Sequence, residues 1–155
     1  MAHIHEKIDF TVDAFIVHKN KVLLRMHDKY HIWLAVGGHV ELDEDPNEAI
    51  MREVKEEVGL DVVLWDCNKK FRGAHRNELE YKELIPPVGM NIHKVSGTHQ
   101  HISMVFFATA DTFDVTPEAP TDEWKWLTAD ELEHMEGLLP DIKLYAKLAL
   151  DTLGE

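Results

Sequence analysis

The stretch WLAVGGHVELDEDPNEAIMREVKEEVGL, residues Trp33 to Leu60, decides the fold of this chain. Its second half predicts a helix from about Pro46 to Val58. Asp45 is a favourable N-cap, proline suits the first helical position, and Glu48 completes a capping box. Gly59 then supplies the C-terminal stop. An apolar stripe at i, i+4 spacing gives this helix a face for the core: Ile50, Val54 and Val58.

Three glutamates near the end of this helix are unfavourable by the ordinary rules of helix design. Glu53, Glu56 and Glu57 follow the i, i+3, i+4 spacing, so a helix stacks their charges on one face, beside the apolar stripe. Like-charged pairs at this spacing destabilise by about 0.2–0.5 kcal/mol each, and the negative end of the helix dipole adds a similar penalty. Three carboxylates beside a Gly37-Gly38 turn, whose backbone oxygens can turn inward, suit a hard divalent cation. We therefore predict a metal site; a solvated acidic face is the alternative.

The remaining segments predict a mixed β-sheet with helices packed against it. The expected strands are Asp9–His18 and Lys21–His27, joined by Lys19-Asn20 as a hairpin, then Trp33–Val36, Asp61–Phe71, Ile102–Ala110 and Glu123–Leu127. Two further helices are expected, one capped by Thr128 with Glu131 in the capping-box position and one over Asp141–Leu153. A long polar stretch, Arg72 to His101, separates two strands, and a connection of that length is more often functional than idle.

Length and composition predict one globular domain over residues 1–155. The net charge of −13 argues against a protein that binds bare nucleic acid, although a bridging cation lets an acidic protein bind an anionic substrate. The single Cys67 excludes an intramolecular disulfide. The N-terminus lacks the apolar run of a signal peptide, and no segment approaches the about 20 apolar residues of a membrane span. We expect a cytoplasmic protein that binds neither nucleic acid nor membrane.

The eleven histidines are scattered along the sequence, with H-x-H pairs at His3/His5 and His99/His101. Zinc sites favour tighter sets of cysteine and histidine, and this chain has one cysteine. We therefore expect surface or core histidines rather than a dedicated histidine metal site.

The pattern across the predicted helix matches one family motif at every defined position. The motif is the Nudix box, G-x5-E-x7-R-E-U-x-E-E-x-G-U with U aliphatic, and the matching residues are Gly38, Glu44, Arg52, Glu53, Val54, Glu56, Glu57, Gly59 and Leu60. The chain therefore resembles a MutT-like Nudix hydrolase, and the resemblance extends through the hairpin before the box and the strands and C-terminal helix after it. It implies an α/β fold (α+β), an α/β/α sandwich around a central mixed sheet, and hydrolysis of a nucleoside diphosphate linked to another moiety.

The resemblance also implies roles for the glutamates and glycines of the box. Glu53, Glu56 and Glu57 are expected to bind Mg²⁺, or Mn²⁺ in its place, with the backbone carbonyl of Gly37 or Gly38 as a further ligand. The metal would neutralise phosphate oxygens and lower the pKa of a bound water, which attacks phosphorus in line. Glu56 is our first choice for the base that accepts the proton of that water.

Other residues are expected to support this site. Arg52 would orient a glutamate by a charge-assisted hydrogen bond, Glu44 would brace the loop and the helix start, and Gly59 would end the helix. Some family members recruit an additional glutamate from the loop before the last strand. Glu118 is the first candidate here and Glu123 the second; a solvated acidic loop is the alternative.

The sequence carries few markers of substrate class. The window around His75 to Glu78 lacks the proline and the tyrosine typical of ADP-ribose and dinucleoside polyphosphate hydrolases, and the NADH and coenzyme A signatures are also absent. By elimination we expect a nucleoside triphosphate or a similar nucleoside diphosphate derivative. Aromatic candidates to hold it are Phe15, Trp33 and Trp124, for which core packing is at least an equal explanation.

Asp141 and the segment Gly73–His101 are the candidates for substrate specificity. Asp141 occupies the region where MutT-like members contact a purine, but an aspartate there is also a good N-cap, and we favour the cap. The long segment Gly73–His101 is expected to supply specificity. Two rival functions stay open: a Nudix-fold nucleotide sensor without activity, and prenyl diphosphate isomerisation, for which Cys67 lies outside the expected position. Many relatives form homodimers, and the sequence leaves the oligomeric state open.

Overall fold

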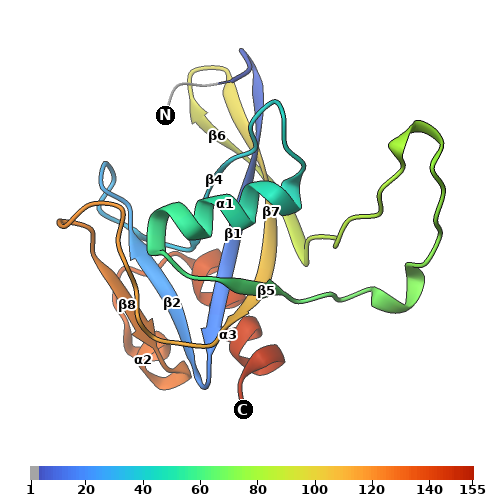
Figure 1. Cartoon of the computed structure of the whole chain (residues 1–155). Coiled ribbons are helices and arrows are strands. Elements are labelled where there is room, and N and C mark those ends of the chain that lie inside the picture. Colours follow the sequence, from blue (N-terminus) through green and yellow to red (C-terminus); the bar gives the residue numbers. More distant parts are fainter. Residues whose placement is uncertain (1–3) are drawn as a thin grey trace.

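One mixed sheet forms the centre of the computed structural model, which describes residues 4–155 (Figure 1). Its strands are β1 (Ile8–His18), β2 (Lys21–Met26), β3 (Trp33–Leu34), β4 (Val36–His39), β5 (Val62–Leu64), β6 (Gly89–Ser96), β7 (His99–Ala110) and β8 (Trp124–Leu127). The main path through the sheet is β3-β2-β1-β7-β5, while β4 pairs with β1, β6 with β7 and β8 with β2. The pairing of β1 with β7 is parallel and the other pairings are antiparallel, so the sheet is mixed as expected.

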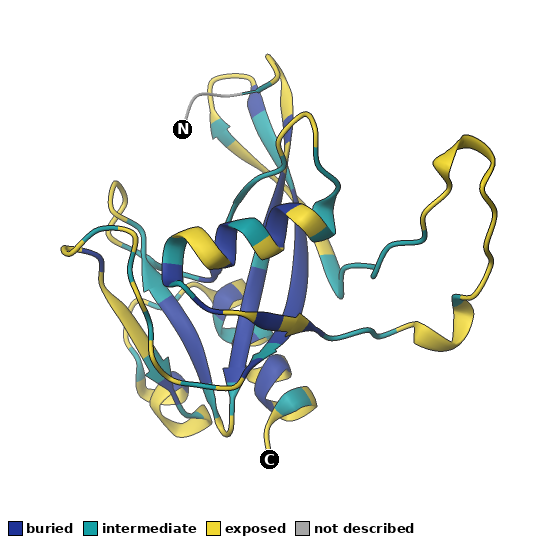
Figure 2. Cartoon of the chain, in the orientation of Figure 1, coloured by how far each residue is buried: buried dark blue, intermediate teal, exposed yellow. Residues whose placement is uncertain are grey.

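The central strand β1 contributes alternate side chains to two separate cores, because successive residues of a strand point to opposite faces. Val12, Ala14 and Ile16 pack with the apolar stripe of helix α1 (Pro46–Val58). Phe15 and Val17 pack with α2 (Ala129–His134) and α3 (Pro140–Leu153) on the other face. Figure 2 shows the buried strands enclosed between these helix layers. This arrangement confirms the predicted α/β/α sandwich.

Helix α1 has the bounds and caps that the sequence predicts. The Asp45 carboxylate accepts a hydrogen bond from the Glu48 N–H at 2.9 Å, and the Glu48 carboxylate accepts one from the Asp45 N–H at 2.9 Å. At the other end, Gly59 adopts φ 68°, a left-handed conformation that glycine reaches without a steric penalty. Both ends of α1 are therefore fixed locally, which positions its glutamates along the chain.

The expected strand Trp33–Val36 is two strands, and the expected Gly37-Gly38 turn is wrong. Gly37 and Gly38 lie inside β4, in register with Asp13 and Val12 of β1. A Cβ on Gly37 would lie 1.9 Å from the Val12 carbonyl oxygen. The absence of side chains therefore lets β4 lie close against β1, and the two glycines extend a strand rather than turning the chain.

Two further expectations are corrected beyond α1. The strand expected over Asp61–Phe71 is only β5, Val62–Leu64, followed by a 3₁₀ turn at Lys69–Phe71. The polar stretch from Arg72 to His101 is not one loop, because its second part forms β6 and the start of β7. Side chains of β6 are mostly exposed, which explains why its sequence lacks the apolar pattern of a core strand.

The segment between β5 and β6 protrudes from the body of the molecule as an exposed arm (Figures 1 and 2). Its return is fixed by Asn47 of α1, whose side-chain amide donates to the Ile85 carbonyl and accepts from the Ile85 N–H, both at 2.9 Å. This arm contains most of the segment to which the sequence assigned specificity.

The C-terminal helices differ from expectation at one cap. Thr128 caps α2 through a capping box with Glu131, as predicted. Helix α3, however, begins at Pro140 with Leu139 as its N-cap, so Asp141 is its second residue and the predicted cap is wrong. The fixed φ of proline suits the first helical position, which starts the helix one residue earlier. Within residues 4–155, none of the helices is long and apolar enough to span a membrane.

Candidate active site

The three glutamates of α1 differ in their exposure although they share one side of the helix. The side chains of Glu53 and Glu57 are 6% and 15% exposed, whereas that of Glu56 is 53% exposed. Two carboxylates are thus held in a largely dry environment, where an ionised group is costly without a positive partner. The protein must supply that charge or bind a cation there.

Glycines of β4 make room for these carboxylates. A Cβ on Gly38 would lie 2.3 Å from Oε1 of Glu53, so only glycine leaves space for this side chain. The N–H of Gly37 donates to Oε2 of Glu57 at 3.2 Å. The strand therefore receives Glu53 at Gly38 and Glu57 at Gly37, whereas Glu56 remains open to solvent.

Arg52 connects the glutamates of α1 with the loop before it. Its Nε and Nη2 donate to the two carboxylate oxygens of Glu44 at 3.0 and 2.7 Å, a bidentate pair. Its Nη1 donates to Glu53 at 2.9 Å and to Glu56 at 3.1 Å. Nη2 also donates to the His39 carbonyl at 3.0 Å. The hydrogen bonds that Arg52 donates to Glu44 hold the pKa of Arg52 above its usual range, so the guanidinium stays charged.

Arg25 of β2 is a second cation at this site, and the sequence analysis missed it. Its Nη1 lies 3.4 Å from Oε1 of Glu57, and its Nη2 lies 3.4 Å from Asp122. The available signal was an arginine directly after the apolar run VLL in the strand KVLLRM. Strand order, which brings Arg25 beside the end of α1, could not be read from that signal.

Burial has the largest effect on the pKa values of Glu53 and Glu57. It raises the pKa of Glu57 to about 8, although Arg25 and the Gly37 N–H favour the ionised form. Glu53 and Glu118 raise the pKa of Glu57 further by charge repulsion. Burial likewise raises the pKa of Glu53, against the opposing effect of Arg52. The protein's own cations therefore leave this cluster short of positive charge.

A divalent cation would supply the positive charge that these carboxylates lack. The donors are carboxylate oxygens, which Mg²⁺ and Mn²⁺ prefer, and they stand in a cradle that a single Cβ at Gly38 would fill. Carboxylates that are expensive to ionise alone become favourable ligands when a cation lies among them. Glu53, Glu56 and Glu57 are the residues that would hold it.

The loop before β8 reaches the same end of α1. The N–H of Glu118 donates to the carbonyl of Glu57 at 3.2 Å, and the N–H of Thr116 donates to the carbonyl of Val58 at 2.9 Å. Glu123 lies farther along, where its carbonyl accepts from the Met26 N–H next to the β2–β8 pairing. The structure therefore brings Glu118, rather than Glu123, beside the glutamates.

The aromatic candidates have different environments. Phe15 is 1% exposed and stacks on Tyr145 at 5.8 Å between ring centroids, so it is a core residue and the expected substrate contact is wrong. Trp33 is half-buried, with Nζ of Lys125 at 5.0 Å from its ring centroid. Trp124 is 36% exposed on β8. Of these three candidates, the two tryptophans offer ring surface to a ligand.

Asp13 is another polar residue that the sequence analysis missed. It lies in β1 in register with Gly37, on the side of the sheet that α3 covers. Burial raises the pKa of Asp13 to about 7, and the nearby charge of Asp141 raises it further. The signal was an aspartate between the apolar residues Val12 and Ala14 of this strand. Asp141 itself is exposed, on the first turn of α3.

Both the sequence and the fold of this chain resemble those of known proteins. The sequence model of the NUDIX domain matches residues 8–148. The solved structure of a NUDIX-family hydrolase from Clostridium perfringens superposes with a TM-score of 0.81 and is 37% identical, covering 94% of this chain and 97% of that one.

Two curated relatives are more distant in sequence. A CTP pyrophosphohydrolase of Escherichia coli is 27% identical over 72% of this chain and 83% of its own length. A dihydroneopterin triphosphate diphosphatase of Haemophilus influenzae is 36% identical over 41% of this chain and 44% of its own length.

Proposed function

Since this chain belongs to the Nudix family and is a hydrolase of phosphoric anhydride bonds, we propose that it is a Mg²⁺-dependent pyrophosphohydrolase acting on a nucleoside triphosphate. One observation carries this proposal: Glu53 and Glu57 lie against the glycines of β4, and Arg52 holds the more exposed Glu56 beside Glu53. A charge deficit at buried carboxylates is a poor arrangement for stability and a good one for binding a divalent ion.

Glu53, Glu56 and Glu57 would hold the metal, and Mn²⁺ could replace Mg²⁺ there. When bound, the ion neutralises phosphate oxygens and lowers the pKa of water, which is the chemistry that in-line attack at phosphorus requires. A carbonyl of Gly37 or Gly38 is proposed as a further ligand because these residues lie against Glu57 and Glu53.

We assign proton transfer to Glu56. Its carboxylate is the most exposed of the three, so water and substrate can reach it, and Nη1 of Arg52 holds it at 3.1 Å. The same nitrogen donates to Glu53 at 2.9 Å, so Arg52 fixes the separation of two carboxylates. Glu44 in turn fixes Arg52 by the bidentate contact. Arg52 and Glu44 are therefore positioning residues.

The substrate class is proposed from the relatives and from the residues around the site. The names of the two curated relatives specify triphosphates, CTP and dihydroneopterin triphosphate, which supports a nucleoside triphosphate for this chain. Trp33, which is partly exposed, is the proposed contact for the base, and Asp141 is a polar candidate beside Asp13. Glu118 is proposed as an additional metal ligand, because its backbone bonds to Glu57.

A panel assay tests this proposal. The purified protein would be incubated with Mg²⁺ and with normal and oxidised nucleoside triphosphates, ADP-ribose, dinucleoside polyphosphates and nucleotide sugars, while mono-, di- and pyrophosphate products are resolved. We expect turnover of a nucleoside triphosphate that EDTA abolishes. Silence across the panel, together with thermal stabilisation by one nucleotide, would favour the non-catalytic sensor instead.

A further inference from the structure

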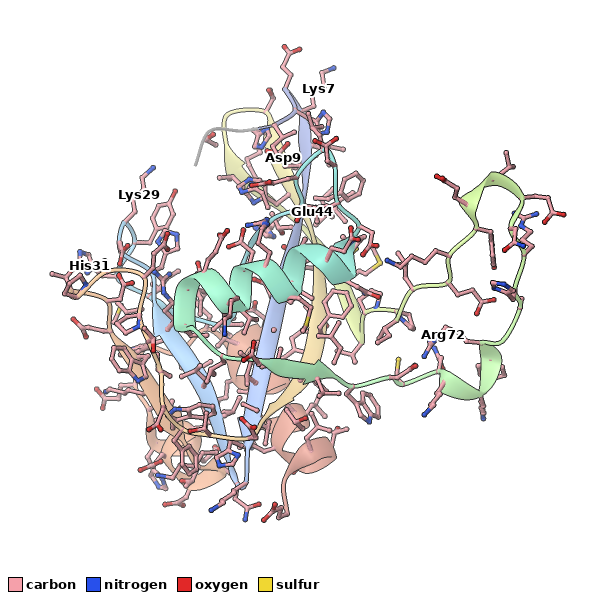
Figure 3. All side chains as sticks on the ribbon, in the orientation of Figure 1. Lys7, Asp9, Lys29, His31, Glu44 and Arg72 are labelled. Carbon is pink, nitrogen blue, oxygen red and sulfur yellow. The ribbon has the colours of Figure 1, made fainter. Side chains whose placement is uncertain are left out.

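A second group of metal-ligating side chains lies at the end of the sheet where β1 and β7 begin, separate from the glutamates of α1. Parallel pairing places Asp9 of β1 in register with His101 of β7. His39 ends β4, and His99 begins β7. Figure 3 shows Asp9 beyond Glu44, toward the start of β1. Three strands that are distant in sequence therefore bring one carboxylate and three imidazoles together.

The distances within this group match those of a metal site. Oδ2 of Asp9 lies 3.4 Å from Nε2 of His39 and 3.3 Å from Nε2 of His99. Ligand atoms of Asp9, His39 and His101 all lie within 4.8 Å of one another. Zinc with bonds of about 2.0–2.1 Å in a tetrahedron separates its ligand atoms by about 3.3–3.4 Å. Two of the separations therefore already have the tetrahedral value.

The orientation of His99 gives an independent reason for a cation here. Its Nδ1 lies 3.1 Å from the carbonyl of Glu6, and a carbonyl only accepts, so this nitrogen carries a hydrogen. In the neutral ring, Nε2 then presents its lone pair toward Oδ2 of Asp9. Two lone pairs that face each other are stabilised by a positive charge between them, supplied by a proton or by a metal ion.

Burial and backbone hydrogen bonds hold these residues in forms that can bind a metal ion. The side chains of Asp9, His39 and His99 are 0%, 12% and 7% exposed. Asp9 accepts hydrogen bonds from the N–H groups of Ile4 and His5 at 3.1 and 2.6 Å, which hold it as a carboxylate. The ring of His101 lies at 4.8 Å from that of His39 and at 5.3 Å from that of His99 between centroids, so the three imidazoles gather around Asp9. Neutral imidazole is the form that binds metals.

We propose that Asp9, His39, His99 and His101 form a structural site for one borderline transition-metal ion, with Zn²⁺ as the best match. Imidazole nitrogen suits zinc, whereas Mg²⁺ and Mn²⁺ prefer oxygen donors. Asp9, His39 and His101 offer three mutually close ligand atoms, and His99 adds a fourth beside Asp9. Four protein ligands would make a closed site of the kind that structural zinc occupies, with no open position for substrate. The ion would join the ends of β1, β4 and β7.

The proposed metal site is connected to the candidate active site through the end of β4. His39 directly follows Gly38, and its carbonyl accepts a hydrogen bond from Arg52 at 3.0 Å. Fixing the imidazole of His39 therefore fixes the end of the strand against which Glu53 packs. The sequence favoured surface or core histidines, because the ligands proposed here are separated along the chain and only the strand register brings them together.

Cobalt provides the test, because tetrahedral Co²⁺ gives an intense visible absorption. The untagged full chain would be titrated with Co²⁺ in saturating Mg²⁺, which occupies the glutamate site, and Zn²⁺ would then be added. We expect one Co²⁺ per chain with a tetrahedral spectrum, which Zn²⁺ abolishes. His101→Ala and His39→Gln should lose this spectrum. Each variant's circular dichroism would be measured, and Asp9→Asn substitutes for any variant that fails to fold.

Three variants serve as controls. His75→Ala removes an exposed histidine of the arm, and His5→Ala removes an N-terminal chelator; His3 lies outside the described residues. Glu57→Gln separates this site from the proposed active site. All three should retain the cobalt spectrum. Absence of a tetrahedral spectrum in the unmodified chain, or its survival in both His101→Ala and His39→Gln, would overturn the proposal and leave a network of imidazolium–carboxylate pairs.

Discussion

Nη2 of Arg52 donates to the backbone carbonyl of His39 at 3.0 Å, so one guanidinium joins α1 to the strand that it faces. The same side chain also bonds Glu44, Glu53 and Glu56. We expect Arg52→Lys to lower kcat by about 10- to 100-fold, as loss of an outer-shell partner does, because an ammonium cannot reproduce the bidentate contact with Glu44. KM should change little. Steady-state kinetics would be compared with Arg76→Lys in the exposed arm; equal kcat values in the two variants would exclude a positioning role.

Gly38→Ala should disturb the protein through Glu53. The new methyl group would lie 2.3 Å from Oε1 of Glu53, so the glutamate or β4 must move. We expect a loss of about 1–3 kcal/mol in the free energy of unfolding, typical of overpacking, and loss of Mg²⁺-dependent turnover. Urea unfolding measures the first effect. In a Glu53→Ala background the same substitution should cost much less, and an unchanged cost would show that the clash lies elsewhere.

Glu57→Gln should lower activity without lowering stability. Burial raises the pKa of the Glu57 carboxyl to about 8, so the folded chain disfavours its ionised form, and a neutral amide in its place should leave the melting temperature unchanged or higher. Turnover should fall by more than the about 10- to 100-fold typical of outer-shell partners, because a proposed direct ligand is lost. The matched control is Glu78→Gln, an exposed glutamate of the arm. Full Mg²⁺-dependent activity in Glu57→Gln would contradict the metal site.

The raised pKa of Glu57 predicts how the free energy of unfolding depends on pH in the absence of metal. Its pKa rises from 4.5 to about 8 on folding, so the folded chain binds this proton more tightly than the unfolded chain. Its stabilising contribution is therefore complete below about pH 4.5 and is lost as the pH rises through about 8. Asp13, raised from 3.8 to about 7, acts in the same direction. Urea midpoints across this range should fall more steeply in the unmodified chain than in Glu57→Gln, and parallel curves would refute the assignment.

Metal binding should show the opposite dependence on pH. Mg²⁺ needs the ionised carboxylate, so its binding must displace the proton of Glu57 and should tighten as the pH rises toward about 8. Isothermal titration in two buffers of different ionisation enthalpy would measure the protons released. Glu57→Gln should release fewer protons for each ion bound. Binding whose affinity is flat across this range would mean that Glu57 is not a ligand.

Local features were predictable from the sequence, and features made by strand register were not. The capping box and the left-handed Gly59 fix α1 within a few residues of chain, and its bounds were predicted to the residue. The glutamates of the candidate site lie on that helix, so their common face followed from its periodicity.

Arg25, Asp13 and the Asp9–histidine group depended on pairings between distant strands, and no local pattern encodes those pairings. Strand β6 was missed because it is an exposed strand without an apolar face. Asp141 was misassigned as a cap because Pro140, one residue earlier, already satisfies the first helical position.

The parallel pairing of β1 with β7 has a consequence for synthesis of the chain. Thr11 and Ser103, which contact each other across this pair, are 92 residues apart. During translation β1 and the whole of α1 leave the ribosome long before β7 exists, so the centre of the sheet cannot close in the nascent chain. Such non-local pairing folds slowly and leaves strand edges exposed in the meantime. The hairpin of β1 with β2 and the pairing of β4 with β1 occupy the other edge of β1, so the edge that β7 takes stays open until β7 is made.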